Sequence, residues 1–297
     1  MTGLRAGDTV ALVTPAGPVR ADLLDRATAA LETWGLTVKR FATAGNRHPA
    51  LRYLADTDER RAADFQAAWR DASVSAVICA RGGYGTQRML DLLDWDALRA
   101  AGPKIFTGSS DVTALHQAIA AHLGVPTLFS PMPGGSLWDE DAAAHLHRVL
   151  FDPGTPVVIH ARDTLVPGTA DGITTGGNLS LLASSVGAPE HRPVRGAIAI
   201  LEDVAEDPYR LDRMLTQLLR AGWFADVTGI VLGSWTGCGD PAEVRTVLAE
   251  RLGPLGVPVL WEAGFGHLPG SVTVPLGVPA TIDGVVLTCG PYCAVRY

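Results

Sequence analysis

The sequence predicts an α/β protein of two domains, in which a smaller β-rich α+β domain follows a first domain built on a parallel sheet. Short apolar runs alternate with helical patterns through the first half, and this rhythm is typical of a parallel sheet with helices on both faces. After about Leu150 the rhythm stops, and short strands surround one clear helix. We therefore place a first domain at residues 1–151, a linker at 152–168 and a second domain at 169–297.

The first domain alternates strands and helices from its start. Asp8–Thr14 is an apolar run typical of a buried strand, and Ala21–Trp34 follows with its leucines on one helical face. Gly35 stands where that helix needs a left-handed residue to end. Asp56 with Glu59 forms the pattern of a capping box at a second helix. Further strands are expected at Thr37–Phe41, Val74–Ala80 and Lys104–Thr107, with helices up to Asp71, from about Thr86, and at Val112–His122.

The second half has weaker helical signals. Residues 152–168 hold three prolines and two glycines without helical periodicity, which indicates a linker. Further on, one amphipathic helix has its apolar stripe at Leu211, Met214, Leu215, Leu218 and Leu219. Short strands are expected at Ala197–Leu201, Gly229–Leu232, Val257–Leu260 and Val285–Leu287.

Composition and charge exclude several classes of protein. Hydrophobic residues make up 47% and charged residues 19% of the 297 residues, which excludes an intrinsically disordered chain. The net charge of −7 argues against nucleic acid as a partner. No apolar run is long enough for a secretory signal or a membrane span. We expect a cytoplasmic protein that has no membrane contact.

The four cysteines are Cys79, Cys238, Cys289 and Cys293, and they lack the spacing of a metal site. We interpret them as buried thiols in a reducing compartment. No metal ion or organic cofactor is expected.

Ser110 lies between a predicted strand and a predicted helix, in the segment KIFTGSSDV. A serine on such a turn is pushed out of the sheet towards backbone N–H groups at the helix start, and those donors suit a developing oxyanion. The segment lacks the second glycine of the G-x-S-x-G pattern, because Val112 stands there. The competing interpretation is that Ser110 or Asp111 only caps the helix. This segment taken alone favours capping.

A glycine-rich loop, Ala80–Gly85 (ARGGYG), follows another predicted strand. Its glycines permit positive φ and close backbone approach, so the loop is a candidate partner in an oxyanion hole. It lacks the spacing of both common phosphate-binding glycine motifs. A purely structural turn is the alternative.

A hydroxyl nucleophile needs a base, and the base needs an orienting partner. Among the eight histidines, His267 stands in the glycine-rich GFGHLPGS, a loop able to present an imidazole to a cleft. A surface histidine is the alternative. For the orienting carboxylate, Glu202 directly follows an apolar strand, and the alternative is an exposed charge at the strand end. Asp203, Glu206 and Asp207 come close behind and are interpreted as a solvated acidic loop. Chain order does not decide among these four.

Taken together, these segments resemble the LD-carboxypeptidase family of serine peptidases, which also contains the microcin C immunity-type peptidases. The resemblance covers nearly the whole chain, and the motifs stand in the family's order. They are LRAGDTVALVTPAGPV, YLADTDERRAADFQAAW, ICARGGYGTQRMLDLLDW, GSSDVTALH, GGNLSLL, LEDVAEDPYRLDRMLTQL, GFGH and TVPLG.

The resemblance implies a catalytic triad. The serine of the family's G-x-S-D turn falls on Ser110, the glutamate of its L-E-D segment on Glu202, and the histidine of its G-x-G-H segment on His267. It further implies an oxyanion hole made by the backbone N–H groups of Gly83 and Asp111. The implied fold is a flavodoxin-like first domain and a smaller β-rich second domain with the site between them, and no cofactor is needed.

Three departures from the family pattern fall near the implied pocket. Ser109 replaces a residue that is often aromatic, Ser271 replaces a common asparagine, and LFSPMPGG keeps Pro131 and Met132 but lacks the usual His-Gly. They bear on specificity more than on activity. We expect substrate-binding roles for Arg81, Tyr84, Met132 and Ser271.

The implied reaction is hydrolysis of an L,D amide bond that releases D-alanine from a cytoplasmic murein tetrapeptide. The alternative is an immunity-type amidase that cleaves aminoacyl-nucleotide antibiotics such as processed microcin C, with Trp138 as a candidate for stacking on adenine. A binding protein that keeps the cleft without catalysis is a rival of another class. The expected partners are a small peptide or aminoacyl-nucleotide substrate and a second copy of the chain in a homodimer.

Overall fold

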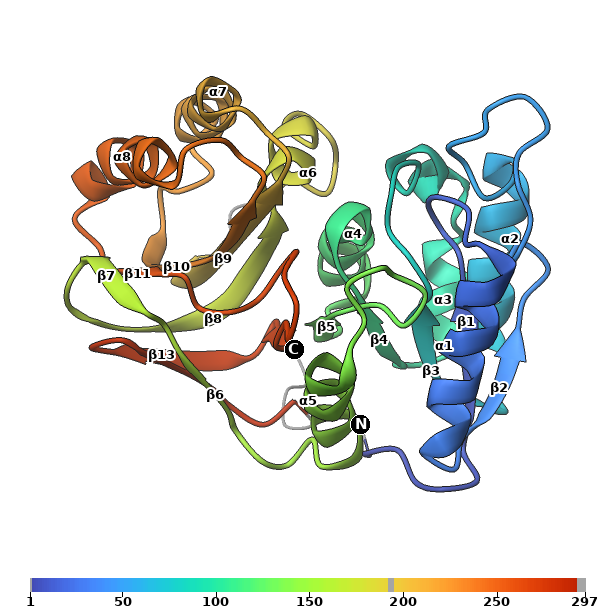
Figure 1. Ribbon diagram of the computed structural model, residues 1–297. Coiled ribbons are helices and arrows are strands. Elements are labelled where there is room, and N and C mark those ends of the chain that lie inside the picture. Colours follow the sequence, from blue (N-terminus) through green and yellow to red (C-terminus); the bar gives the residue numbers. More distant parts are fainter. Residues whose placement is uncertain (1, 192–194, 293–297) are drawn as a thin grey trace.

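The computed structural model describes residues 2–191 and 195–292, and it contains two sheets that lie side by side (Figure 1). The first sheet has six strands in the order β12-β5-β4-β3-β1-β2. The second has eight in the order β6-β14-β13-β8-β9-β10-β11-β7. The predicted α/β class, with a parallel first sheet and a mixed second sheet, is confirmed.

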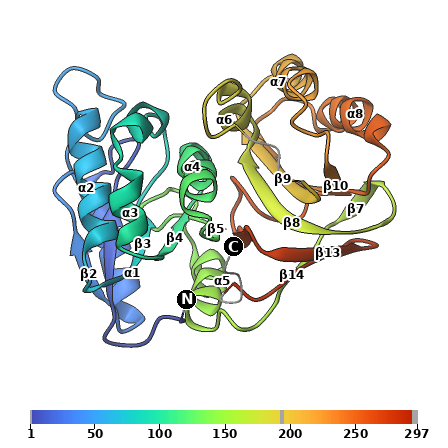
Figure 2. The same cartoon turned by 180° about the vertical axis from the view of Figure 1, so that it is seen from behind.

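The first sheet is parallel apart from β12 and is covered by helices on both faces, as Figures 1 and 2 show from opposite sides. Its parallel strands are β1 (Thr9–Val13), β2 (Thr37–Arg40), β3 (Val74–Cys79), β4 (Ile105–Gly108) and β5 (Thr127–Phe129). One face packs against α1 (Ala21–Thr33) and α5 (Glu140–Phe151). The other packs against α2 (Asp58–Arg70), α3 (Trp95–Ala100) and α4 (Thr113–Leu123).

Local sequence sets the ends of the first two helices. Gly35 has φ +77° just after α1, as the predicted left-handed stop requires. The predicted capping box at α2 is wrong by one residue, because the Thr57 hydroxyl accepts the Arg60 N–H instead. Asp56 is buried, and its carboxylate accepts a hydrogen bond from the Asn46 amide.

The helix expected from about Thr86 is replaced by two shorter elements. A 3₁₀ turn, η1, covers Gln87–Leu92, and α3 begins afresh after it. The Asp94 carboxylate accepts the Ala97 N–H and caps α3, so the chain restarts there instead of continuing one helix.

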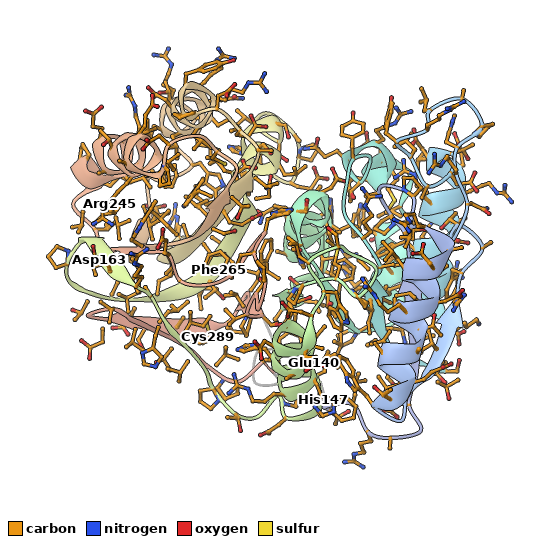
Figure 3. The ribbon with its side chains drawn as sticks, in the orientation of Figure 1. Glu140, His147, Asp163, Arg245, Phe265 and Cys289 are labelled. Atoms are coloured by element: carbon orange, nitrogen blue, oxygen red, sulfur yellow. The ribbon has the colours of Figure 1, made fainter. Side chains whose placement is uncertain are left out.

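The second sheet has helices on one face only (Figure 1). Its strands include β8 (Thr169–Asn178), β9 (Ala197–Val204), β10 (Val227–Thr236), β11 (Val259–Trp261), β13 (Pro279–Asp283) and β14 (Val286–Cys289). The covering helices are α6 (Leu179–Ser184), α7 (Pro208–Arg220) and α8 (Pro241–Leu252). In α7 the predicted stripe buries Leu211, Leu215 and Leu218. Nη2 of Arg245 in α8 lies 2.6 Å from Oδ2 of Asp163, and Figure 3 labels both residues.

The stretch 152–168, expected to be a linker, supplies the two outer strands of the second sheet. These are β6 (Val157–His160), which pairs with β14, and β7 (Asp163–Val166), which pairs with β11. Two residues separate β6 from β7, although the strands lie at opposite edges of the sheet. The sheet must therefore curl until its edges approach each other.

The two sheets share a strand and a core. β12 (Val274–Leu276) comes from the second half of the chain but pairs antiparallel with β5 in the first sheet. Phe265, labelled in Figure 3, is buried against Phe129 of β5, with ring centroids 6.1 Å apart. Apolar side chains of both sheets form one continuous cluster. The two halves are thus packed as one body.

Three predicted thiols, Cys79, Cys238 and Cys289, are buried and free, whereas Cys293 lies outside the described residues. No helix within residues 2–191 and 195–292 has the length and apolar character that crossing a membrane requires. Over the same residues, no group of three or more His, Cys, Asp and Glu side chains is arranged to hold a metal ion.

Candidate active site

Ser110 occupies a strained turn directly after β4. Its φ is +60°, in the left-handed region that a residue with a Cβ rarely adopts, and holding a serine there costs about 1–3 kcal/mol. A Cβ on Gly108 would lie 2.8 Å from Val112 Cγ1, so the turn is too tight for another residue. The short helix after Ser109 and the start of α4 have no side-chain capping bond. Helix capping, the competing interpretation of this serine, is therefore wrong.

The loop after β3 packs onto this turn. A Cβ on Gly82 would lie 2.9 Å from Ser110 Cβ, so only glycine allows the loop so close to the serine. Gly83 has φ +115°. The buried Asp111 carboxylate accepts the Thr86 N–H at 2.8 Å, and burial raises the pKa of that carboxyl despite this hydrogen bond. Asp111 thus fixes the glycine loop to the serine turn through its side chain, a contact the sequence did not reveal.

Glu202 and His267 form a hydrogen-bonded pair at the end of β9. His267 Nδ1 donates to Glu202 Oε2 at 2.6 Å, and Glu202 is fully buried. Burial lowers the pKa of His267, but the hydrogen bond and charge of Glu202, with the charge of Asp203 behind it, outweigh burial and raise it. Because Nδ1 is held by the carboxylate, Nε2 is the nitrogen left to act as a base.

Asn178, which was assigned no role from the sequence, and Asp203 extend this pair. The interpretation of Asp203 as part of a solvated loop is wrong, because it is a buried residue of β9. The Asn178 amide donates to Glu202 Oε1 at 3.1 Å and to Asp203 Oδ1 at 3.0 Å. Burial and the charge of Glu202 raise the pKa of Asp203 to about 6. The signal available in the sequence was the GGN that joins β8 to α6, where Asn178 also caps the helix by accepting the Leu181 N–H.

The loop that carries His267 is held by two serines. Ser234 Oγ accepts the His267 backbone N–H at 2.7 Å, and Ser271 Oγ accepts that of Gly266 at 3.0 Å. Gly266 has φ +106°, and a Cβ there would lie 2.6 Å from Glu202 Oε2. The glycine thus lets the loop pass over the buried carboxylate.

A pocket of about 340 Å³ joins these parts, because Ser110 and His267 both line it. Of the residues predicted to bind substrate, Arg81, Met132 and Ser271 line this pocket. Tyr84 does not; it is half exposed and its ring contacts Tyr53. The lining residues come from both halves of the chain and are Arg81, Gly82, Gly83, Ser109, Ser110, Pro131, Met132, Gly135, Ser136, Leu137, Trp138, Val204, Gly266, His267, Leu268 and Ser271.

The arrangement suits acyl transfer. A strained serine, a histidine held by a buried carboxylate and a glycine loop against the serine are the groups that a serine hydrolase needs. Within the described residues the Ser110 hydroxyl makes no hydrogen bond to His267, and in enzymes without substrate this contact is often loose.

Two family models match the chain. Residues 10–130 match the LD-carboxypeptidase N-terminal domain and residues 171–282 match the LD-carboxypeptidase C-terminal domain. A Streptomyces coelicolor protein with a provisional carboxypeptidase name is 52% identical over 94% of this chain and 92% of its own. The murein tetrapeptide carboxypeptidase of Pseudomonas aeruginosa is 31% identical over 93% of each chain.

A solved structure agrees with these relatives. The muramoyltetrapeptide carboxypeptidase from Oxalobacter formigenes superposes with a TM-score of 0.83 at 29% identity, covering 95% of this chain and 98% of its own. Both family models together span most of the described residues, in the order in which they occur along the chain. This protein therefore belongs to the LD-carboxypeptidase family of serine peptidases and is a carboxypeptidase.

Proposed function

We propose that this protein hydrolyses the L,D amide bond between diaminopimelate and the terminal D-alanine of a murein tetrapeptide. The observation that carries the proposal is the pocket that brings Ser110 together with the His267–Glu202 pair. The substrate itself is suggested by the names of the Pseudomonas aeruginosa and Oxalobacter formigenes relatives.

In this mechanism His267 Nε2 takes the proton of Ser110 as its oxygen attacks the scissile carbonyl. The backbone N–H groups of Gly83 and Asp111 receive the oxyanion. His267 then gives the proton to the leaving nitrogen, so that D-alanine departs and an ester to Ser110 remains. Water, deprotonated by His267, cleaves the ester and restores the enzyme. Glu202 holds the imidazole in the useful tautomer throughout.

The test is incubation of the purified protein with the tetrapeptide and mass analysis of the products. The expected products are the tripeptide and free D-alanine. The Ser110→Ala variant should release neither and should no longer react with a fluorophosphonate probe. Its matched control is Ser109→Ala, which removes the neighbouring hydroxyl and should leave the labelling of Ser110 in place.

The aminoacyl-nucleotide alternative is an outcome of the same experiment. It requires an aromatic side chain that is free to stack on a base. Trp138 lines the pocket, but its ring already contacts Trp34, with centroids 6.2 Å apart. Cleavage of an aminoacyl sulfamoyl adenosine without D-alanine release from the tetrapeptide would overturn the murein proposal.

A further inference from the structure

The pocket carries its charges unevenly. Among the residues that line it, Arg81 is the only lysine or arginine. Two buried carboxylates, Glu202 and Asp203, stand behind His267, which lines the same pocket. An anionic group on the substrate is therefore attracted to Arg81 and repelled by the two carboxylates behind His267.

Arg81 is held in place by a hydrogen bond and keeps further N–H donors available for a ligand. It follows β3 and directly precedes Gly82, the residue that packs against Ser110. Its Nη1 donates to the Pro18 carbonyl at 2.6 Å, which restrains the guanidinium. Within residues 2–191 and 195–292, Nε and Nη2 of Arg81 make no hydrogen bond or ion pair. Two parallel N–H donors of this kind match the two oxygens of a carboxylate.

We infer that Arg81 binds the C-terminal carboxylate of the substrate and so restricts the enzyme to the last residue of a peptide. This inference rests on the proposed function, because it places the D-alanine carboxylate on the Arg81 side of the scissile bond. A carboxypeptidase must distinguish a free terminal carboxylate from a continuing amide. A carboxylate that enters this partly buried pocket needs a cation to replace its water.

The experiment compares two substrates, the murein tetrapeptide and the same peptide with a C-terminal amide. In the wild type, kcat/KM for the acid should exceed that for the amide by about 10- to 100-fold, the worth of a hydrogen bond to a charged group. In Arg81→Gln this ratio should fall towards one, with most of the change in KM. A general loss of folding or of triad geometry lowers kcat/KM for the acid and for the amide by the same factor. It therefore leaves the acid-to-amide ratio of each enzyme unchanged.

The matched control is Arg20→Gln. Arg20 lies near Pro18 in the chain but is exposed, pairs with Asp22 and does not line the pocket. Its acid-to-amide ratio should equal that of the wild type. An unchanged ratio in Arg81→Gln, or equal cleavage of acid and amide by the wild type, would overturn the inference while D-alanine release still supported the proposed function.

If the tetrapeptide is not cleaved at all, the proposed function is wrong. A second measurement tests the role of Arg81 in that case. Protection of Ser110 from fluorophosphonate labelling is then measured with an N-acyl-D-alanine and with its amide. The acid should protect the wild type at about 10- to 100-fold lower concentration than the amide. Equal protection by the two compounds would refute the role of Arg81.

Discussion

At the scale of single residues, two buried carboxylates share one amide donor. Glu202 and Asp203 are adjacent in β9, and Asn178 donates to both. Burial and the negative charge of Glu202 both disfavour the charged form of Asp203, and they raise its pKa to about 6. Only Glu202 reaches His267, so Asp203 acts on the imidazole through its charge alone.

Replacing Asp203 by Asn should move the acid limb of the kcat/KM profile to lower pH. His267 must be neutral to act as a base, and the charge of Asp203 is one of the causes that raise the pKa of His267. The plateau should fall by no more than about tenfold, because one neutral hydrogen bond is worth about 0.5–1.5 kcal/mol. The measurement is a pH–rate series beside Asp207→Asn, an exposed aspartate just before α7. An acid limb that stays in place would contradict this account.

The resemblance to the family's motifs singled out Ser110, Glu202 and His267, and the structure gives the last two a short hydrogen bond. Asn178 and the side chain of Asp111 could not be assigned in this way. Asn178 joins the end of one strand to a carboxylate on the next, and Asp111 reaches a loop that follows a different strand. Such contacts depend on how strands are ordered in a sheet, which local patterns do not specify.

At the scale of elements, the loop from Gly264 to Ser271 determines where the His267 imidazole lies. Gly266→Ala should lower kcat/KM by about 10²-fold, because the new methyl group would meet Glu202 and Ser234 and displace His267. Gly264→Ala is the matched control. It has φ +72° in the same loop but no atom within 4 Å of its Cβ position, so it should lose only about 1–2 kcal/mol of stability. Equal activities of the two variants would refute the steric explanation.

The N-terminus of α5 is fixed to this same loop by Asp139. Its Oδ1 accepts the Ala142 N–H and caps the helix, while its Oδ2 accepts the Gly270 N–H at 2.7 Å. These backbone donors lower the pKa of Asp139, so the carboxylate is charged at neutral pH. One side chain thus connects the helix after the pocket loop to the loop that carries His267.

Asp139→Asn should separate the two roles of this carboxylate. Asn caps a helix as well as Asp does, so the melting temperature should change little. Its NH₂ group, however, would face the Gly270 N–H, and kcat/KM should fall by about tenfold as that hydrogen bond is lost. Thermal melting and steady-state kinetics on the same preparation test both statements. Unchanged kinetics would show that the Gly270 contact does not position His267.

The strands β1, β3 and β4 of the first sheet were predicted to within a residue or two, because parallel strands buried on both faces are largely apolar. The strands in 152–168 were missed. Val157 and Ile159 point inwards and Val158 and His160 outwards, but an alternation over only four residues is a weak signal. Their partners, β14 and β11, lie far along the chain, so only tertiary pairing stabilises them.

At the scale of the whole molecule, β12 makes the two sheets dependent on each other. It completes the first sheet beside β5 while both of its neighbours in sequence belong to the second half of the chain. The shared apolar cluster extends across the same boundary. Residues 1–151 alone would thus lack a strand and leave the edge of β5 unpaired.

The whole chain should therefore unfold in one cooperative transition. Val274 of β12 is fully buried, and Val274→Ala should lower the stability of that single transition by about 2 kcal/mol without splitting it. Calorimetry of the wild type and the variant is the measurement. Val158→Ala, which truncates a half-exposed valine of β6, is the control and should have little effect. Two separate transitions in the wild type would contradict this coupling.

The late position of β12 also has a consequence for synthesis on the ribosome. The five parallel strands of the first sheet emerge by residue 129, but the strand that closes their edge is translated about half a chain later. At a synthesis rate of roughly 5–20 residues per second, β5 stays uncovered for several seconds or more. During that interval a nascent chain on the same messenger could pair with it. A chaperone that binds exposed strand edges should therefore raise the yield of this protein more than its modest size suggests.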